Sequence, residues 1–192
     1  MNICVYGASS KTIDAQFTDT GHALGVLIAQ HGYGLVFGGG DNGMMGAVAC
    51  GTHDGGGRVI GIAPRFFNVD GVLYPHCDEL IYTDTMRKRK QKMEDLSGAF
   101  IVTPGGIGTF EEFFEILTLK QLNQTKKPLV ILNTAGYYDS MFAMMRHTAD
   151  TNFMSEKTFD LIKIVDTPEQ AIEYIEHYVE REVDVEELRQ LK

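Results

Sequence analysis

The sequence lacks several features that mark common classes of protein. Basic residues are in deficit, with 17 Lys and Arg against 26 Asp and Glu and a net charge of −9, so the basic face of a general nucleic-acid or anionic-membrane binder is not expected. No apolar run is long enough to cross the ~30 Å hydrocarbon core of a bilayer, and the first residues show neither the basic nor the apolar region of a secretory signal. We therefore expect a cytoplasmic protein that binds neither nucleic acid nor membrane.

Cysteine and histidine are sparse and scattered. The three cysteines, Cys4, Cys50 and Cys77, form no CxxC motif, and the six histidines form no HxxxH or HExxH pair. This spacing argues against a disulfide framework and against a zinc site built on cysteines. The run His76-Cys77-Asp78 resembles a metal site, but adjacent residues diverge on a helix or strand. The sequence therefore predicts neither a metal nor a cofactor.

Short apolar runs alternate with segments of helical periodicity, which is typical of βαβ units. Several runs, such as ICVY, FIV and LVIL, are almost wholly apolar, as strands covered on both faces must be. The sequence predicts an α/β fold with a doubly wound, mostly parallel, Rossmann-like sheet and helices on both faces. The expected strands are Asn2–Tyr6, Gly34–Phe37, Arg58–Ile62, Glu79–Tyr82, Ala99–Val102, Leu129–Leu132 and Leu161–Val165.

Two of the expected helices have clear end signals. The first should begin near Asp14 and end at Gly32. The last opens with Thr167-Pro168-Glu169-Gln170, which supplies an N-cap, a proline at the first helical position and the glutamine of a capping box. The end of the chain is acidic and has no long apolar pattern. We expect one nucleotide-binding domain over residues 1–181 and an acidic tail or short extension over 182–192.

Three strand-to-helix turns are rich in glycine or other small residues. They are Gly7-Ala8-Ser9-Ser10, Gly38-Gly39-Gly40-Asp41-Asn42-Gly43 and Thr103-Pro104-Gly105-Gly106-Ile107-Gly108-Thr109. Glycine lets backbone N–H groups approach an anion beside the positive end of the next helix, although a single turn can need glycine for steric reasons alone. Three such turns at the carboxyl edge of one sheet predict a phosphate site that includes Ser9, Gly39 and Gly40. None of them is GxGxxG or GxxxxGK[ST], so a mononucleotide is favoured over a dinucleotide.

Two charged residues near these turns have both a structural and a functional interpretation. Thr109 is a natural N-cap, and Glu112, three residues later, would complete its capping box; the same position keeps the carboxylate close to the ligand loop. In the segment MRKRKQKM, Arg89 falls on the apolar face defined by Met86 and Met93. An inward guanidinium needs a carboxylate or phosphate partner, whereas a snorkelling surface arginine needs none. The residue pattern alone leaves both alternatives open for each residue.

Three segments carry a resemblance to a known family: PGGIGTFEE at 104–112, the upstream MRKRKQKM, and GGGDNGMMG at 38–46. Together they resemble the LONELY GUY (LOG) proteins, over the chain from Asn2 to about Val179. The resemblance implies that Arg89 and Glu112 are the catalytic pair. The nucleotide contacts that it implies are Lys90, Gly105, Gly106, Ile107, Gly108, Thr109, Phe110, Glu111 and, more weakly, Thr118.

The LOG resemblance implies a hydrolase that cleaves the N-glycosidic bond of a nucleoside 5′-monophosphate, releasing free base and ribose 5-phosphate. The substrate would be a cytokinin riboside 5′-monophosphate or AMP; Arg87 and Lys88 depart from the plant pattern MHERK, which leaves the base preference open. The resemblance also implies a homodimer.

Two other functions compete with hydrolysis. One is a non-catalytic nucleotide- or cofactor-binding carrier or sensor, because molybdenum-cofactor carriers have similar glycine loops. The presence of both Arg89 and Glu112 favours the enzyme, since a carrier needs the loops but not the pair. The other is lysine decarboxylation, an older label of the family, which is disfavoured because no lysine follows an apolar strand in the context of a pyridoxal phosphate pocket.

Overall fold

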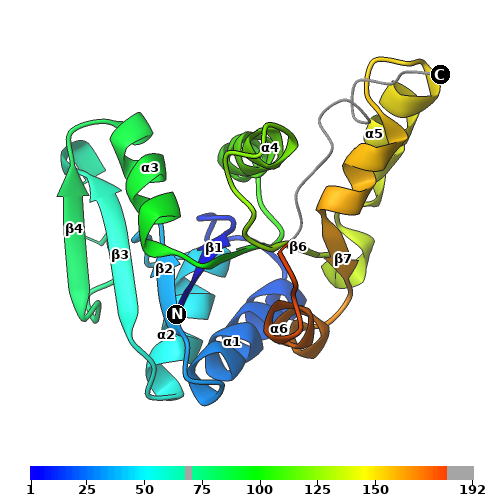
Figure 1. The fold of residues 1–192 in the computed structure, drawn as a ribbon. Coiled ribbons are helices and arrows are strands. Elements are labelled where there is room, and N and C mark those ends of the chain that lie inside the picture. Colours follow the sequence, from blue (N-terminus) through cyan, green and yellow to red (C-terminus); the bar gives the residue numbers. More distant parts are fainter. Residues whose placement is uncertain (68–70, 181–192) are drawn as a thin grey trace.

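The computed structural model describes residues 1–67 and 71–180, which contain a seven-stranded sheet with parallel neighbours throughout (Figure 1). The strands are β1 (Asn2–Tyr6), β2 (Gly34–Phe37), β3 (Val59–Pro64), β4 (Glu79–Thr83), β5 (Ala99–Val102), β6 (Leu129–Leu132) and β7 (Lys163–Val165). Their order across the sheet is β4-β3-β2-β1-β5-β6-β7. The predicted fold class is confirmed, and the differences lie at strand ends. β3 continues to Pro64 because that residue still pairs with Thr83 of β4, and β7 begins late because Leu161 ends a 3-10 helix.

Helices cover both faces of the sheet (Figure 1). On one face lie α1 (Ala15–Gln30), α2 (Gly43–Asp54) and α6 (Pro168–Glu176), and on the other α3 (Met86–Leu96), α4 (Ile107–Gln121) and α5 (Asp139–Asp150). Successive strand residues point to opposite faces, so Ile3 and Val5 pack in the core under α1, α2 and α6, while Cys4 and Tyr6 pack under α3, α4 and α5. Burial on both sides explains the apolar strands.

The predicted helix-end signals are largely confirmed. Asp14 is the N-cap of α1 and accepts a hydrogen bond from the Gln16 N–H (2.9 Å), and Gly32 follows the helix with φ +75°. Thr167 caps α6 by accepting from the Gln170 N–H (3.4 Å). The Gln170 side chain accepts from the N–H of Asp166 (3.0 Å), one residue before the position expected in a capping box. The predicted acidic tail at 182–192 lies outside the described residues.

The order of the strands places two of the small-residue turns side by side. Winding changes direction at β1, whose neighbours are β2 and β5. The loop after β1 is joined to the loop after β5 because Ala8 N–H donates to the Pro104 carbonyl (3.1 Å) and the Thr103 hydroxyl donates to the Tyr6 carbonyl (2.8 Å). A Cβ on Gly7 would lie 2.3 Å from Thr103 Oγ1, so only glycine lets the two loops touch. In doubly wound sheets, ligands bind in the crevice at such a switch point.

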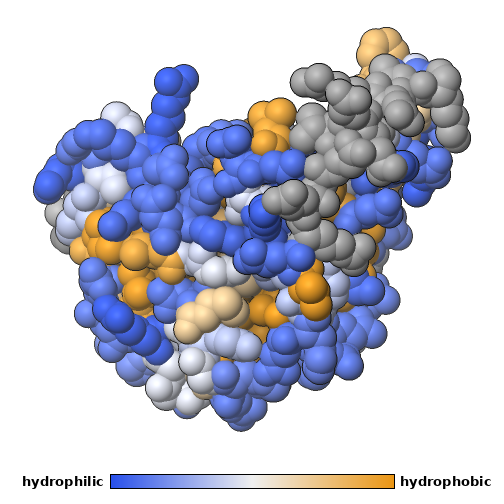
Figure 2. Space-filling model, viewed as in Figure 1, coloured by the Kyte–Doolittle hydropathy of each residue, from blue (hydrophilic) through white to orange (hydrophobic). Residues whose placement is uncertain are grey.

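The surface agrees with the composition. Hydrophilic residues cover most of the face seen in Figure 2, with apolar residues showing between them in patches. No helix in the described part of the chain is both long and apolar enough to cross a membrane.

Candidate active site

A cavity of about 380 Å³ opens at the carboxyl edge of the sheet, between the loops that follow β1 and β5. Its volume falls in the range of small-molecule sites. The predicted site residues that it brings together are Ser9, Arg89, Gly106, Ile107, Gly108, Thr109, Glu111 and Glu112. Met45, Phe67 and Met86 add an apolar side to the lining, which the motif analysis did not assign to the site. The aromatic and two methionines offer a surface for the flat base of a nucleotide.

Arg89 lies inside the protein on α3, as one of the two sequence interpretations required. Thr85 caps α3 by accepting from the Lys88 N–H (3.2 Å), which starts the helix one turn before Arg89. The residue is only 5% exposed. Its Nε donates to the carbonyl of Ile62 (3.0 Å) and its Nη1 donates to Oε1 of Glu112 (2.9 Å). The inward arginine is therefore a partnered group and not a snorkelling one.

Glu112 provides that partner from the first turns of α4, and it is 8% exposed. Burial raises the pKa of Glu112, and the Arg89 guanidinium opposes that shift through its charge and its hydrogen bond. A buried carboxylate without such a cation would take up a proton. The pair thus holds an anionic oxygen in a largely dry position beside the cavity, where its charge acts strongly on a bound ligand.

Gly38 makes room for the arginine and was not among the predicted site residues. A Cβ built on Gly38 would lie 2.0 Å from Nη2 of Arg89. The sequence signal was present, because Gly38 opens the run Gly38–Gly43, but the run was interpreted as a phosphate loop. Nε of Arg89 donates to the carbonyl of Ile62. Because this acceptor is a backbone group, no residue type in the sequence indicated its role.

The start of α4 differs from the prediction. The N-cap is Gly106 and not Thr109, and α4 begins at Ile107, so the predicted capping box of Thr109 and Glu112 is wrong. The glycines allow the chain to enter the helix early, and Gly105 leaves space for the Thr109 hydroxyl, which would lie 2.1 Å from a Cβ at that position. Among residues 1–67 and 71–180, no side chain forms a hydrogen bond that caps this helix. Its first N–H groups and the positive end of its dipole lie at the cavity wall, an arrangement suited to a phosphate.

Gly108 offers a test of this wall. An added Cβ at Gly108 meets nothing within 4 Å, and the residue lies in the first turn of α4, so Gly108→Ala should raise the free energy of unfolding by up to about 1 kcal/mol. The new methyl group also lines the cavity, so KM for the nucleotide should rise while kcat changes little. Thermal unfolding and steady-state kinetics check this. A lower melting temperature, or an unchanged KM, would contradict the assignment.

Lys90 does not line the cavity, although the resemblance implied that it contacts the nucleotide. Its Nζ pairs with Glu111, and with Glu115 at 2.8 Å. It lines a neighbouring hollow of about 480 Å³ between α3 and α4, together with Arg87 and Glu94. Glu111 borders both this hollow and the cavity. A nucleotide contact from Lys90 would require that it exchange these carboxylates for the phosphate.

The remaining predicted residues make contacts outside the cavity lining. The carbonyl of Gly105 accepts from the Tyr137 hydroxyl (2.9 Å), and Phe110 packs edge-on against Tyr138. Thr118 donates to the Phe114 carbonyl (2.7 Å). Gly39 accepts from the Tyr74 N–H (2.9 Å), and Gly40 bridges to Leu73. The structure does not place Gly105, Phe110, Thr118, Gly39 or Gly40 in the lining of the cavity.

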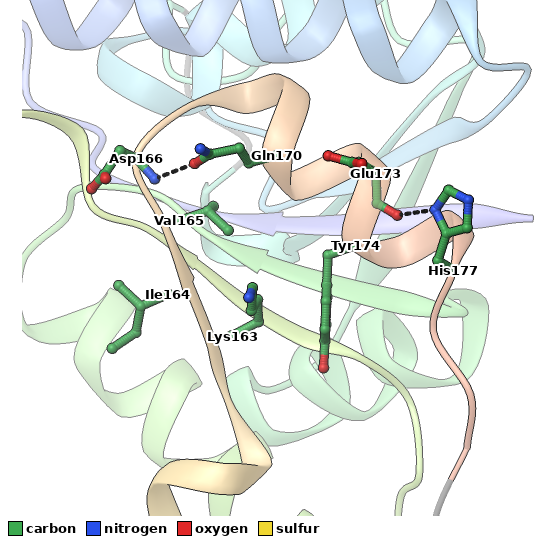
Figure 3. A pocket seen from close by; sticks show the side chains of 8 residues that line it. All are labelled: Lys163, Ile164, Val165, Asp166, Gln170, Glu173, Tyr174 and His177. Carbon is green, nitrogen blue, oxygen red and sulfur yellow. Dashed lines mark hydrogen bonds between the residues drawn. The ribbon is translucent and has the colours of Figure 1, made fainter.

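A second cavity, of about 440 Å³, lies between β7 and α6 and contains none of the predicted site residues (Figure 3). Two of its polar side chains have partners: Gln170 accepts from the Asp166 N–H, and His177 Nδ1 lies 2.8 Å from the Glu173 carbonyl. The exposed side chains of Lys163 and Ile164 complete its open side. This cavity offers no buried charge comparable to Glu112.

The chain is similar to proteins of known name. The family model described as "Possible lysine decarboxylase" matches residues 45–175. A cytokinin riboside 5′-monophosphate phosphoribohydrolase of Mycobacterium tuberculosis is 38% identical over 170 residues, which are 88% of this chain and 90% of that protein. One from Arabidopsis thaliana is 34% identical over 95% of this chain and 85% of its own.

Solved structures share the fold at lower identity. A molybdenum cofactor carrier protein of Chlamydomonas reinhardtii superposes with a TM-score of 0.68 at 24% identity, covering 91% of this chain and 94% of that one. Likeness at this level of identity establishes the fold alone. The match of the family model and the identity to the phosphoribohydrolases go further: the chain belongs to the LOG family.

Proposed function

We propose that this protein hydrolyses the N-glycosidic bond of nucleoside 5′-monophosphates. The observation that carries the proposal is the buried pair of Arg89 and Glu112 beside a cavity whose wall is the uncapped start of α4. Such a site offers a carboxylate that can stabilise positive charge developing on the sugar. It also offers a surface that can bind the negatively charged phosphate. The names of relatives at 34% and 38% identity support the same reaction.

The phosphate would bind at the first N–H groups of α4, with Ser9 beside it on the loop after β1. A ribose attached to that phosphate would then lie in the cavity that Glu112 also lines. As the bond between the sugar and the base breaks, its electrons leave with the base and positive charge develops on the sugar. The Glu112 carboxylate stabilises that charge and takes a proton from the water that attacks the anomeric carbon. Solvent returns a proton to the base, so the products are free base and ribose 5-phosphate.

As the solution is made more acidic, kcat/KM should fall at a higher pH than it would if the catalytic carboxylate had the pKa of an ordinary glutamate. Glu112 acts as the anion, and burial raises its pKa above the usual ~4.3. A raised pKa means that the carboxylate takes up its proton, and activity is lost, at a higher pH as the solution is made more acidic. The acid limb of kcat/KM against pH measures this value. In Arg89→Gln the opposing cation is gone, so the limb of the residual activity should move to still higher pH; an unmoved limb would show that another group titrates.

Two other functions fit the site less well. A carrier would need the loops, but it has no use for a carboxylate kept buried at the cost of desolvation. A decarboxylase using pyridoxal phosphate needs a lysine in its pocket, and the described lining of the cavity contains none. Burial lowers the pKa of Lys120 to about 8, yet its Nζ donates to the Lys127 carbonyl (2.7 Å) and it lies outside that lining. The residues present therefore do not fit that cofactor.

We also propose that the chain is a homodimer. Met86 is 39% exposed and Ile107 83% exposed at the cavity mouth, which leaves apolar surface for a second copy beside the site. Met44 and Met93, in contrast, are 0% and 1% exposed and offer no surface to a second copy. Light scattering behind gel filtration should give the mass of two chains, and the mass of one chain would end this proposal.

Incubation with three compounds tests the proposed reaction: AMP, isopentenyladenosine 5′-monophosphate and adenosine. Chromatography of the free base should show release from both monophosphates and rank them as substrates. Adenosine should react at least about 10²-fold more slowly, because it lacks the phosphate that positions the sugar. Equal release from adenosine and AMP would refute the phosphate assignment, and nucleotide binding without base release would favour the carrier.

A further inference from the structure

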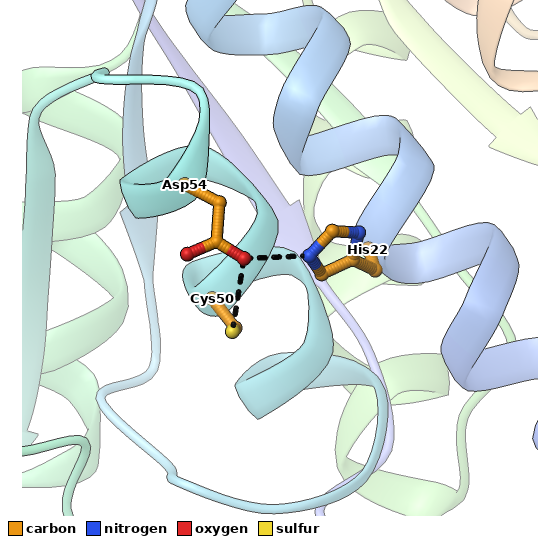
Figure 4. A group of neighbouring side chains, drawn as sticks. All are labelled: His22, Cys50 and Asp54. Atoms are coloured by element: carbon orange, nitrogen blue, oxygen red, sulfur yellow. Dashed lines mark hydrogen bonds and ion pairs between the residues drawn. The ribbon is translucent and has the colours of Figure 1, made fainter.

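A group of three metal-type ligands lies on the face of the sheet opposite α3 and α4. His22 comes from α1, whereas Cys50 and Asp54 are one helical turn apart on α2, and the three side chains converge (Figure 4). His22 Nε2 is 2.9 Å and Cys50 Sγ is 3.6 Å from Oδ2 of Asp54. All three donor atoms lie within 4.8 Å of one another.

The two helix backbones are in direct contact beside these side chains. A Cβ on Gly51 would lie 2.0 Å from the carbonyl oxygen of His22, and one on Gly25 would lie 2.2 Å from that of Val48. Glycine is therefore required at both positions. The close contact fixes the separation of α1 and α2 at the residues that carry the ligands, so the site is organised by the backbone before any ion binds.

The donor set and its spacing suit a tetrahedral ion of borderline softness. Imidazole, thiolate and carboxylate are the protein ligands of Zn²⁺, at about 2.0–2.3 Å from the metal. Tetrahedral angles at those lengths place N and O about 3.4 Å apart and S and O about 3.6 Å apart. The structure has 2.9 Å and 3.6 Å, so binding requires the histidine and aspartate to separate by about half an ångström. An ion pair between His22 and Asp54 alone would not require a cysteine at position 50.

A reactive cysteine is the competing interpretation, and the surroundings of Cys50 disfavour it. The Cys50 thiol donates to Oδ2 of Asp54 at 3.6 Å, and a carboxylate at this distance disfavours the negatively charged thiolate that a nucleophile requires. A divalent ion reverses this electrostatic balance, because it binds the Asp54 carboxylate and its positive charge stabilises the Cys50 thiolate.

We propose that His22, Cys50 and Asp54 form a three-residue site for Zn²⁺ or a similar divalent transition metal. Binding releases the Cys50 thiol proton to solvent, and the imidazole proton moves by exchange from Nε2 to the Nδ1 side, so that Nε2 can coordinate. Water fills the fourth position. None of the three residues lines the cavity at Arg89 and Glu112, so this site is separate from the proposed chemistry.

Cobalt provides a direct spectroscopic test. Tag-free protein, stripped with a chelator and dialysed, is titrated with Co²⁺. One equivalent should produce the intense visible bands of a tetrahedral ion and a sulfur-to-cobalt charge-transfer band, and Zn²⁺ should displace both. Cys50→Ser should abolish the charge-transfer band. His22→Ala and Asp54→Asn should each weaken binding at least about tenfold, the smallest loss usual when a metal site is disturbed.

Matched controls separate this site from adventitious binding. Cys77→Ser removes another cysteine that is not fully buried. His53→Gln with His76→Gln removes two histidines outside the proposed site, whose ring centroids are 5.7 Å apart. Both controls should bind Co²⁺ like the parent, and circular dichroism should show every variant folded. The proposal is overturned if no saturable binding of one equivalent is found, or if binding survives unchanged in Cys50→Ser and His22→Ala.

Discussion

Glu112→Gln should abolish most base release while leaving nucleotide binding nearly intact. The variant keeps the size of the side chain, and its amide oxygen can still accept from Nη1 of Arg89, which is 2.9 Å from the carboxylate. What it loses is the negative charge that stabilises the sugar cation and the base that accepts the proton of water. Groups in such roles contribute about 10²–10⁴-fold, so kcat should fall by about that factor.

The control for this variant is Glu115→Gln. Glu115 lies one turn further along α4, and its side chain is 42% exposed, so removing its charge should leave base release unchanged. The stability cost of Glu112→Gln should stay below the about 3–5 kcal/mol expected when a buried pair loses one partner, because the hydrogen bond is retained. Near wild-type turnover by folded Glu112→Gln protein would remove the residue from the mechanism.

Gly38→Ala should disable the site through Arg89, although Gly38 itself touches no substrate. Its Cβ would lie 2.0 Å from Nη2 of Arg89, and the guanidinium is held on its other sides by Ile62 and Glu112. The side chain must shift, and overpacking of this kind costs about 1–3 kcal/mol. Displacement of a positioning group by about 1 Å can cost 10²-fold in rate, so kcat should fall by about that factor.

Two readouts distinguish lost positioning from simple destabilisation. A displaced guanidinium supports the Glu112 carboxylate less well, so the acid limb of kcat/KM should move to higher pH in Gly38→Ala. Gly57→Ala is a control for destabilisation alone, because a Cβ on Gly57 would lie 2.7 Å from the Cβ of Ala29 and Gly57 does not line the cavity. If Gly38→Ala is as stable and as active as the parent, the tight packing around Arg89 is not required.

The fold was largely predictable because strands buried on both faces are almost wholly apolar in the sequence. ICVY and LVIL must be covered on both faces, and α/β alternation then allows few arrangements. The inward position of Arg89 was one of the two alternatives that its place on the face of Met93 left open, and the structure shows Met93 1% exposed and Arg89 5% exposed on that face. Its partner could not be fixed from that pattern, because α3 and α4 meet only in the folded protein and the contact spans 23 positions.

The start of α4 and the role of Gly38 were not predictable for steric reasons. The sequence favoured Thr109 because Glu112 three residues later would complete a capping box, yet the cap lies at Gly106. Contacts with other parts of the fold decide where α4 begins. The Pro104 carbonyl accepts a hydrogen bond from the loop after β1, and the Thr109 hydroxyl occupies the space beside Gly105. At Gly38 the glycine is required by an arginine that is distant in sequence.

The central claim is that this site cleaves the bond between base and sugar by hydrolysis, and the product stoichiometry tests it most directly. Purified protein is incubated with AMP in buffer free of phosphate and pyrophosphate, and adenine and ribose 5-phosphate are both quantified. The account predicts that the two appear in a one-to-one ratio and that Glu112→Gln forms both at least about 10²-fold more slowly. Intact AMP recovered from a protein that binds it, or adenine released equally by Glu112→Gln, would contradict the account.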